Sequence, residues 1–534
     1  MASFTELVNG MKTTFRTGKT KPYEWRRQQL EGVLKLMDEN REEIAAALNK
    51  DLHKPKLEAV VFEIDFCRND LVDTMNNLKE WMKPEKVKKS LANIMDSCYI
   101  QKEPFGVALV IGAWNYPIQL TIMPIVGAIA AAYIKKEPYG VALVIGAWNY
   151  PIQLTILPLF GALAAGNCVL LKPSEVSWNT AQLLEKLVPK YLDNDCVKVV
   201  NGGVTETTAL LKERYDYIFY TGNTFVGKIV MKAASEYLTP VTLELGGKSP
   251  VYVDKNCDYK AVANRLIWGK TCNAGQTCIA PDYVMCTKDV QEELLQNMKT
   301  TLGEFFPDDP SQSESYGRMV NSRHFQRVKK MIDSNQDSIA IGGDTNEKDN
   351  YISPTILKDV KFTDSAMNEE IFGPVLPIVP VKDEDAAIEH IVSGEKPLAM
   401  YVFSNDKTVK DKFRNSTSSG GLVINDTMMH AGVMTLPFGG VGNSGMGAYH
   451  GKLTFDTFSH NRACLERELK MESLQSIRYP PYTQKKMGNI QWATRKKLKG
   501  RSFMSFVPFF VIGTIAAYVI KVFGLHNKLP FLNE

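Results

Sequence analysis

The chain has 534 residues, of which 44% are hydrophobic and 23% charged, a composition ordinary for a globular protein of about two or three domains. Its net charge of +4 is small for this length and gives no reason to expect a nucleic-acid partner. The 9 cysteines and 7 histidines are scattered, with no CxxC pair and no HxxxH or HExxH pattern, and no secretory signal opens the chain. We therefore expect free thiols in a reducing compartment and no metal site.

The N-terminal part, to about residue 89, has a helical pattern. Apolar residues recur three and four positions apart among charges, as at Leu30, Val33, Leu34 and Met37. This spacing predicts amphipathic helices that pack one face on a core and leave the charged face in solvent.

A tandem duplication follows this helical part. Residues 99–132 repeat as residues 133–166, with 27 of 34 positions identical. Each copy predicts a strand, at Val107–Ile111 or Val141–Ile145, then a Trp-Asn-Tyr-Pro turn and an apolar helix. Two copies are too few for a solenoid, so the near-identity indicates a recent duplication or two alternative exons translated together.

The second copy is predicted to be the working one. It alone runs directly into a further apolar strand, Val169–Leu171. A strand–helix–strand unit of this length favours a right-handed parallel crossover. We therefore expect residues 99–132 to be an insert packed outside the sheet. The alternative, in which the first copy takes the sheet position and the second loops out, stays open.

Strands and helices alternate after the duplication. The expected elements are helix Thr180–Leu192, strand Val197–Val200, a helix near Glu206–Lys212 and strand Tyr217–Tyr220. This alternation predicts a doubly wound α/β domain. Gly222 and Gly227 then flank the start of a helix, and such a turn suits a phosphate group, although alone it is a weak signal.

A second α/β region, residues 241–431, carries a candidate nucleophile. Cys278 follows the turn-permitting run Gly-Gln-Thr, which can present a thiol at a loop-to-helix junction. There, free N–H groups would lower the pKa of the thiol and could hold an oxyanion. A buried structural cysteine is the alternative for Cys278 considered alone. Two glutamates in distinctive motifs favour a catalytic role for Cys278 over a structural one. They are Glu244 in Leu-Glu-Leu-Gly-Gly-Lys and Glu370 in Glu-Ile-Phe-Gly-Pro.

The C-terminal tail is separate in composition. Residues 503–520 carry no charge, and Val522 and Phe523 extend the apolar stretch past Lys521. A basic run at 495–501 precedes it. These features predict a membrane anchor over residues 503–523, with the globular body on the cytosolic side. A buried core helix is the alternative.

The thiol loop, the LELGGK and EIFGP segments, the FYTGNTFVGK turn and the LLKPSE strand end together resemble the aldehyde dehydrogenase family. The resemblance runs to about Arg462 and is broken only by the duplication. The Tyr-Thr-Gly-Asn-Thr turn, the Gly-Gln-Thr-Cys-Ile-Ala-Pro-Asp-Tyr run and the apolar tail resemble the class 3 branch, and within it the membrane-anchored fatty aldehyde dehydrogenases.

This resemblance implies an α/β protein with a Rossmann-like NAD-binding domain, an α/β catalytic domain, a small oligomerisation hairpin and a C-terminal membrane helix. The expected parts are a helical portion of the cofactor domain (1–98), the duplicated insert (99–132), the NAD-binding domain (133–240), the catalytic domain (241–431), a return to the cofactor domain with the oligomerisation segment (432–465), a linker with a gatekeeper-like helix (466–502) and the anchor (503–523).

The resemblance also implies the catalytic roles. Cys278 would attack the aldehyde, and the side-chain amide of Asn149 with the Cys278 backbone N–H would stabilise the oxyanion of the thiohemiacetal. In the first copy the residue that matches Asn149 is Asn115. Glu244 would act as the general base for the water that hydrolyses the thioester.

The cofactor expected from the resemblance is NAD, with NADP possible. Lys172 and Glu175 would reach the adenosine ribose, where a carboxylate repels a 2′-phosphate. Glu370 would hold the nicotinamide ribose, and Glu369 is expected to be a solvated charge. The full expected cofactor set is Trp148, Lys172, Glu175, Gly222, Gly227, Glu370 and Phe372.

The expected substrates are medium- to long-chain aliphatic aldehydes, which partition into bilayers because each buried CH₂ contributes about 0.8 kcal/mol. The family implies a homodimer on the endoplasmic reticulum membrane, with the peroxisomal membrane possible. Two other interpretations stay open: a thiol esterase that does not turn over a cofactor, and an inactive isoform or scaffold whose cofactor domain is disrupted by the duplication.

Overall fold

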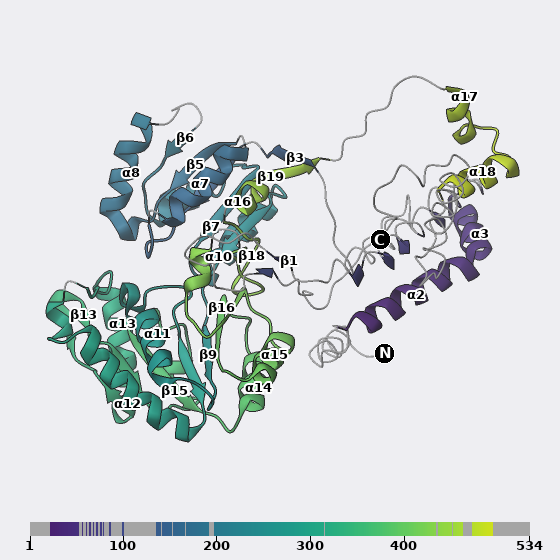
Figure 1. Ribbon diagram of the computed structural model, residues 1–534. Coiled ribbons are helices and arrows are strands. Elements are labelled where there is room, and N and C mark those ends of the chain that lie inside the picture. The colour runs from purple at the N-terminus through teal and green to yellow at the C-terminus, as the bar shows by residue number, and fades with distance from the viewer. Residues whose placement is uncertain are drawn as a thin grey trace, which may run out of the picture. The chain divides into compact units, whose positions relative to one another are not determined.

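The computed structural model describes residues 22–52, isolated positions between 56 and 79, 85–86, 99–100, 135–139, 141–151, 153–165, 167–191, 197–313, 315–433, 436–450, 452–462 and 472–494 (Figure 1). These residues fall into two compact units. One is drawn from residues 1–83, 106–132 and 467–534, and the other from residues 84–105 and 133–466.

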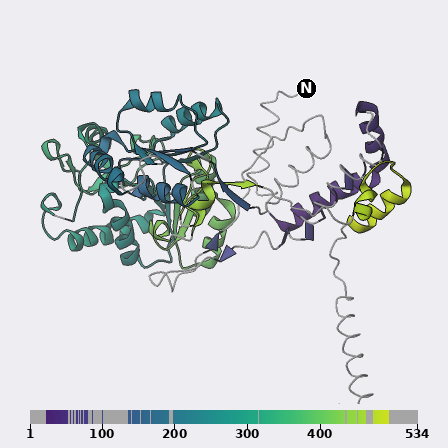
Figure 2. The ribbon, with the colours of Figure 1, turned by 90° about the horizontal axis from the view of Figure 1, so that it is seen from above.

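The first unit is helical. It contains α2 (Tyr23–Glu39), α3 (Arg41–Leu52), α17 (Glu472–Gln475) and α18 (Gln484–Thr494). Leu30 and Met37 are buried, as the predicted amphipathic pattern requires. Figures 1 and 2 show α18 beside α3, and a hydrogen bond of 2.9 Å from Gln491 Nε2 on α18 to Asp65 Oδ2, which follows α3 in the chain, joins two distant parts of the sequence.

A six-stranded sheet in the second unit confirms the predicted doubly wound domain. Its order is β18-β8-β7-β4-β5-β6, and every neighbouring pair is parallel except β18 with β8. The strands are β4 (Val141–Ile145), β5 (Cys168–Lys172), β6 (Val197–Val199), β7 (Tyr217–Thr221), β8 (Val241–Glu244) and β18 (Gly445–Met446). The connecting helices are α7 (Gln153–Ala165), α8 (Trp178–Tyr191), α9 (Val204–Leu210) and α10 (Thr224–Ser235).

The second copy of the duplicated unit supplies β4 and α7. Strand β4 lies between β5 and β7, which is the point where the strand order reverses and where open α/β sheets bind ligands. Of the first copy, only β2 (Tyr99–Ile100) is described, paired with β1 (Glu85–Lys86). Residues 101–132, which were predicted to form an insert outside the sheet, lie outside the described residues.

Strand β3 (Lys135–Pro138) pairs antiparallel with β19 (Ser459–Arg462). It brings the return segment 432–465 back to the second copy, where an oligomerisation hairpin was predicted. The short helix α16 (Lys452–Thr457) precedes β19 and packs on α7.

A seven-stranded sheet forms the rest of the second unit. Its order is β11-β14-β15-β10-β9-β16-β17, parallel except for β11. The strands are β9 (Pro250–Val253), β10 (Tyr283–Cys286), β11 (Ile339–Ile341), β14 (Thr355–Leu357), β15 (Val375–Pro380), β16 (Ala399–Phe403) and β17 (Gly421–Ile424), with a small β12–β13 pair (Thr345–Asn346, Tyr351–Ile352) beside them. The helices are α11 (Tyr259–Thr271), α12 (Lys288–Phe305), α13 (Ser322–Asp333), α14 (Glu384–Ser393) and α15 (Lys407–Ser416).

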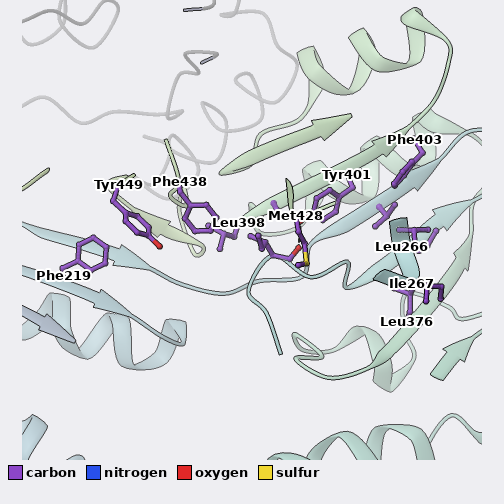
Figure 3. Close-up of a cluster of buried hydrophobic side chains, with 14 of the residues drawn as sticks. Phe219, Leu266, Ile267, Leu376, Leu398, Tyr401, Phe403, Met428, Phe438 and Tyr449 are labelled. Carbon is purple, nitrogen blue, oxygen red and sulfur yellow. Dashed lines mark hydrogen bonds between the residues drawn. The ribbon is translucent and has the colours of Figure 1, made fainter. Parts of the chain in front are cut away.

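One continuous apolar cluster joins the two sheets. Figure 3 shows it running from Phe219 on β7, through Tyr449 and Phe438, to Tyr401 and Phe403 on β16. All five rings are buried. Because close-packed cores resist small displacements, this cluster fixes the two sheets against each other and so fixes the space between them.

Within the described ranges, no helix is both long and apolar enough to cross a bilayer. The predicted anchor, residues 503–523, lies outside those ranges.

Candidate active site

Two cavities of similar size meet at Cys278. The first, of about 1100 Å³, lies at the carboxyl ends of the strands of the six-stranded sheet, and the second, of about 1120 Å³, lies beside α7 and the thiol loop. Asn149 and Cys278 line both cavities. The Cys278 side chain can therefore face a ligand in the first cavity and a ligand in the second cavity at the same time.

The first cavity gathers most of the residues predicted from the sequence. Its walls include Trp148, Asn149, Lys172, Glu175, Gly222, Glu244, Cys278, Glu370 and Phe372. Gly227 lies one turn into α10 and packs against Leu245, where a Cβ atom would meet Leu245 Cδ2 at 2.6 Å. The structure thus brings together nine of the ten predicted residues around one cleft and places the tenth directly behind its wall.

The thiol loop has an unusual backbone. Helix α11 gives way to the 3₁₀ turn η4 (Cys272–Gly275), in which Asn273, Ala274 and Gly275 have φ values of 51°, 50° and 72°. A left-handed conformation costs about 1–2 kcal/mol for a residue with a Cβ, so the two non-glycine residues need support from their surroundings. Ala274 is buried in a cluster with Phe306 and Tyr316, and a Cβ at Gly275 would lie 2.2 Å from Gly373 O.

The expectation that Cys278 heads a helix is wrong. Cys278 lies in a turn after η4, and the next regular element is strand β10. Without a helix terminus, burial dominates and raises the pKa of the thiol, and the carboxyl groups of Glu370 and Glu244 raise it further. The resting thiol is therefore neutral.

Glu244 ends strand β8 with its side chain in the cleft. It is 3% exposed, and neither carboxyl oxygen has a hydrogen-bond partner among the described residues. Burial raises the pKa of this carboxyl well above its ordinary value. A buried carboxyl without partners is costly, and the combination is typical of a group that moves protons.

Lys172 and Glu175 stand at the end of β5. Lys172 is 2% exposed, and its Nζ donates to Glu175 Oε2 at 2.7 Å. Partial burial acts to raise the pKa of Glu175, but hydrogen bonds from Lys172 and from a backbone N–H outweigh it and lower that pKa. The carboxylate is ionised at neutral pH and can accept hydrogen bonds from sugar hydroxyls.

The start of α10 forms a turn at the same edge of the sheet. Asn223 caps the helix by accepting from Val226 N at 2.9 Å. A Cβ at Gly222 would lie 2.1 Å from Tyr220 Oη, so a larger residue there would have to displace that tyrosine side chain. Thr224 and Phe225, the first residues of α10, line the cleft, and backbone N–H groups at such a helix terminus can bind anions.

Glu370 lies opposite, on the EIFGP segment. Burial raises its pKa to about 8, and its Oε1 has no hydrogen-bond partner within the described ranges. Its backbone is held by Arg327, which donates to the carbonyls of Glu370 and Ile371 at 3.3 and 2.6 Å. Glu369 is 58% exposed and pairs with Arg327 at 3.2 Å, in agreement with the solvated role expected for it. Phe372 meets Trp148 edge to face, with ring centroids 5.4 Å apart.

The second cavity was not predicted from the sequence. Its walls are mainly apolar and aromatic, and they include Tyr150, Leu154, Leu157, Trp268, Cys272, Thr277, Ile279, Met428, Phe438 and Tyr449. Cys272, predicted to be a packing thiol, lies 3.8 Å from Tyr150 Oη on this wall. The one signal in the sequence was the apolar helix after Asn149, which becomes α7 and contributes Leu154 and Leu157.

The family model described as the aldehyde dehydrogenase family matches residues 2–132 and again residues 130–463. The human aldehyde dehydrogenase family 3 member B1 is 47% identical over 482 residues, covering 90% of this chain and 95% of that relative. Family 3 member A2 of Pongo abelii is 45% identical over 516 residues, covering 96% and 98%. The mouse dimeric NADP-preferring aldehyde dehydrogenase is 48% identical over 481 residues, covering 90% and 98%.

Solved structures agree with these relatives. A substrate-bound aldehyde dehydrogenase of Staphylococcus aureus has 38% sequence identity and a TM-score of 0.66, covering 92% of this chain and 100% of that one. The Mycobacterium tuberculosis aldehyde dehydrogenase complexed with NAD+, at 23% identity and a TM-score of 0.56, covers 82% and 83% and shares the fold. Fold, sequence and family model converge, and the resemblance to the class 3 branch is confirmed: this chain is an enzyme of the aldehyde dehydrogenase family.

Proposed function

We propose that this enzyme oxidises medium- to long-chain aliphatic aldehydes to carboxylic acids, with NAD or NADP as the hydride acceptor. The observation that carries the proposal is that Cys278 lines both a cleft that gathers ionisable side chains and an apolar cavity. A dinucleotide in the cleft and an aldehyde in the cavity would meet at this one thiol.

In the first half of the reaction, Cys278 Sγ adds to the aldehyde carbon to form a thiohemiacetal, while the carbonyl π bond breaks and the thiol proton passes to the carbonyl oxygen. The charge that develops on the carbonyl oxygen needs donors, and the Asn149 side-chain amide with the Cys278 backbone N–H supplies them. When bound, the nicotinamide ring would accept the hydride from the former aldehyde carbon, which leaves a thioester on Cys278.

In the second half, Glu244 takes a proton from the water that hydrolyses the thioester. Burial raises its pKa above the ordinary value, which makes its carboxylate a stronger base than that of an exposed glutamate. The absence of hydrogen-bond partners for both its oxygens among the described residues leaves them free to hold that water.

The residues of the cleft fit a dinucleotide. Glu175, ionised and paired with Lys172, accepts hydrogen bonds from the adenosine ribose hydroxyls, which favours NAD over NADP. The turn at Gly222 leads into the N-terminus of α10, which contains Gly227, and backbone N–H groups there would hold the diphosphate. Glu370 would hold the nicotinamide ribose, and Phe372 and Trp148 line the same cleft.

The apolar cavity supports an aliphatic substrate. Leu154, Leu157, Ile279, Met428 and Phe438 line it, and each CH₂ removed from water against such a wall is worth about 0.8 kcal/mol. The uncharged stretch 503–520 would anchor the enzyme in the endoplasmic reticulum or peroxisomal membrane, beside substrates that partition into lipid. The β3–β19 pair would contribute to a homodimer.

The test is NADH formation from hexadecanal and NAD by the full chain and by Cys278→Ala. We expect turnover by the full chain and its loss in the variant. Turnover that survives in Cys278→Ala contradicts the thiol mechanism. No turnover by the full chain, with turnover restored when residues 99–132 are deleted, would instead mean that the duplication inactivates this isoform.

A further inference from the structure

The two proposed oxyanion donors come from segments far apart in the sequence. Asn149 lies on the turn after β4, and Cys278 lies on the loop after α11. A donor pair stabilises an oxyanion only when both N–H groups point at the same small volume. Some contact must therefore set the distance between the turn and the loop.

Asn273 makes that contact. Its Nδ2 donates to the Asn149 backbone carbonyl at 2.9 Å and to the Gln276 carbonyl at 3.0 Å. One carbonyl belongs to the donor-bearing turn and the other to the thiol loop, two residues before Cys278. Both N–H groups of a single amide thus join the two segments. A second link, between Tyr150 Oη and Thr277 Oγ1 at 3.0 Å, joins side chains only.

The rest of the loop is anchored on its other side. The Gln276 side chain donates to the carbonyls of Asn273 and Arg318 at 3.0 and 2.9 Å, and its Oε1 accepts from Val320 N at 2.9 Å. Asn273 itself has φ 51° and ψ 32°, a left-handed conformation that asparagine tolerates better than most residues. Asparagine is therefore suited to this position both by its backbone and by its two amide donors.

We propose that Asn273 is a positioning residue that holds the Asn149 amide in register with the Cys278 N–H and so assembles the oxyanion site. This inference rests on the proposed function, which assigns those two donors. It adds a residue that touches neither substrate nor cofactor but sets the geometry of the groups that do.

The test separates reactions that need an oxyanion site from one that does not. Asn273→Gly keeps the left-handed backbone accessible and removes the amide, and Asn273→Asp keeps the shape but turns donors into acceptors. For each variant we would measure aldehyde oxidation, hydrolysis of 4-nitrophenyl acetate, alkylation of Cys278 by iodoacetamide, and NADH binding by fluorescence. Alkylation displaces iodide from a saturated carbon and forms no oxyanion.

We expect both carbonyl reactions to fall about 10- to 100-fold, less than the 10²- to 10³-fold loss typical of deleting a donor outright. Alkylation and NADH binding should stay within about twofold. Asn350→Gly is the matched control, because Asn350 also has a left-handed backbone (φ 48°) but lies outside both cavities, and it should change none of the four.

Two outcomes overturn the proposal: carbonyl reactions that are unchanged in both variants, or alkylation that falls in parallel with them, which would mean a collapsed loop. Asn149→Ala separates this failure from failure of the proposed function. If Asn149→Ala leaves ester hydrolysis unchanged, the donor assignment itself is wrong. If it lowers ester hydrolysis while the Asn273 variants do not, only the positioning role is wrong.

Discussion

The two cavities that meet at Cys278 are built in different ways. The cleft lies at the carboxyl ends of parallel strands, and its ionisable groups, Lys172, Glu175 and Glu244, are positioned by the ends of β5 and β8. The apolar cavity is walled by α7, α11 and loops as distant as Met428 and Tyr449. Regular strands therefore position the charges, whereas side-chain packing between elements shapes the substrate cavity.

Amino-acid substitutions in the two cavities should therefore have different effects. A change at a strand end alters one charge with little effect on the fold, because the sheet ladder holds the backbone. A change in the apolar wall alters volume and packing together. We expect substitutions in the cleft to act on discrete chemical steps and substitutions in the cavity to act in graded fashion on substrate size.

The largest expected effect in the cleft comes from Glu244→Gln. Loss of the base should slow steady-state aldehyde oxidation about 10²- to 10⁴-fold and leave the thioester as the accumulating species. Rapid-mixing measurements of NADH should then show a burst followed by slow turnover. Glu369→Gln is the control, because that carboxylate is 58% exposed, and its rate should stay within about twofold. Equal losses in the two variants would contradict the assignment of the base.

Glu370→Gln should weaken NAD binding about tenfold. It should also change how NAD affinity depends on pH. Burial raises the pKa of Glu370 to about 8, so its carboxyl is mostly neutral at pH 7 and ionises as the pH rises through 8. An ionised carboxylate accepts hydrogen bonds from ribose hydroxyls more strongly, so NAD affinity should rise from pH 7 to pH 9. Titrations of Glu370→Gln should lack this rise, and a parallel rise would assign it to another group.

The same shift predicts the sign of a stability effect. The carboxyl of Glu370 keeps its proton to about pH 8 in the folded protein, whereas the unfolded chain loses it near the ordinary value of 4.5. The Glu370 carboxyl therefore stabilises the folded protein most below pH 4.5, and this contribution to stability is lost as the pH rises to about 8. Denaturant unfolding of Glu370→Gln should show a shallower decline over this interval than the parent chain.

The apolar cavity predicts a graded dependence on chain length. If each CH₂ contributes about 0.8 kcal/mol, kcat/KM should rise about fourfold per methylene until the cavity is filled. Leu157→Trp would shorten the cavity and move the plateau to shorter aldehydes without changing NADH affinity. A flat response from butanal to dodecanal would contradict an aliphatic substrate site.

The smallest expected effect is that of Tyr150→Phe. It removes the hydrogen bond to Thr277 Oγ1 but keeps the ring in the cavity wall. Loss of one hydrogen bond of about 0.5–1.5 kcal/mol should lower aldehyde oxidation about two- to tenfold. Rate measurements on Thr277→Val and on the double variant would check whether the two side chains act as a pair, because their effects should then not add.

The sequence alone predicted the cleft well, because its signals are local. Strand β4 was predicted as Val141–Ile145 and has those bounds, and Glu244, Glu370 and Cys278 meet although they lie on three separate segments. Apolar runs bounded by glycine and proline mark strands, and parallel strands bring their carboxyl ends to one edge. A resemblance in several spaced motifs then assigned each side chain a role.

The apolar cavity and the thiol loop could not be predicted in this way. A left-handed backbone is unfavourable for alanine. Ala274 adopts one because its burial beside Phe306 and Tyr316 outweighs that local cost. The helix expected at Cys278 rested on local propensity and was wrong for the same reason. Met428 and Tyr449 reach the cavity wall only through the packing that joins the two sheets, which no short stretch of sequence encodes.

One thiol serves both cavities, and protection of Cys278 from alkylation tests this shared role most directly. The rate of labelling by iodoacetamide would be followed by mass spectrometry with NADH alone, with dodecanoic acid alone as a mimic of the product, and with both. We predict that each ligand alone slows labelling of Cys278 and that the two together slow it further. Protection by only one ligand, or displacement of one ligand by the other, would contradict a thiol shared between two separate cavities.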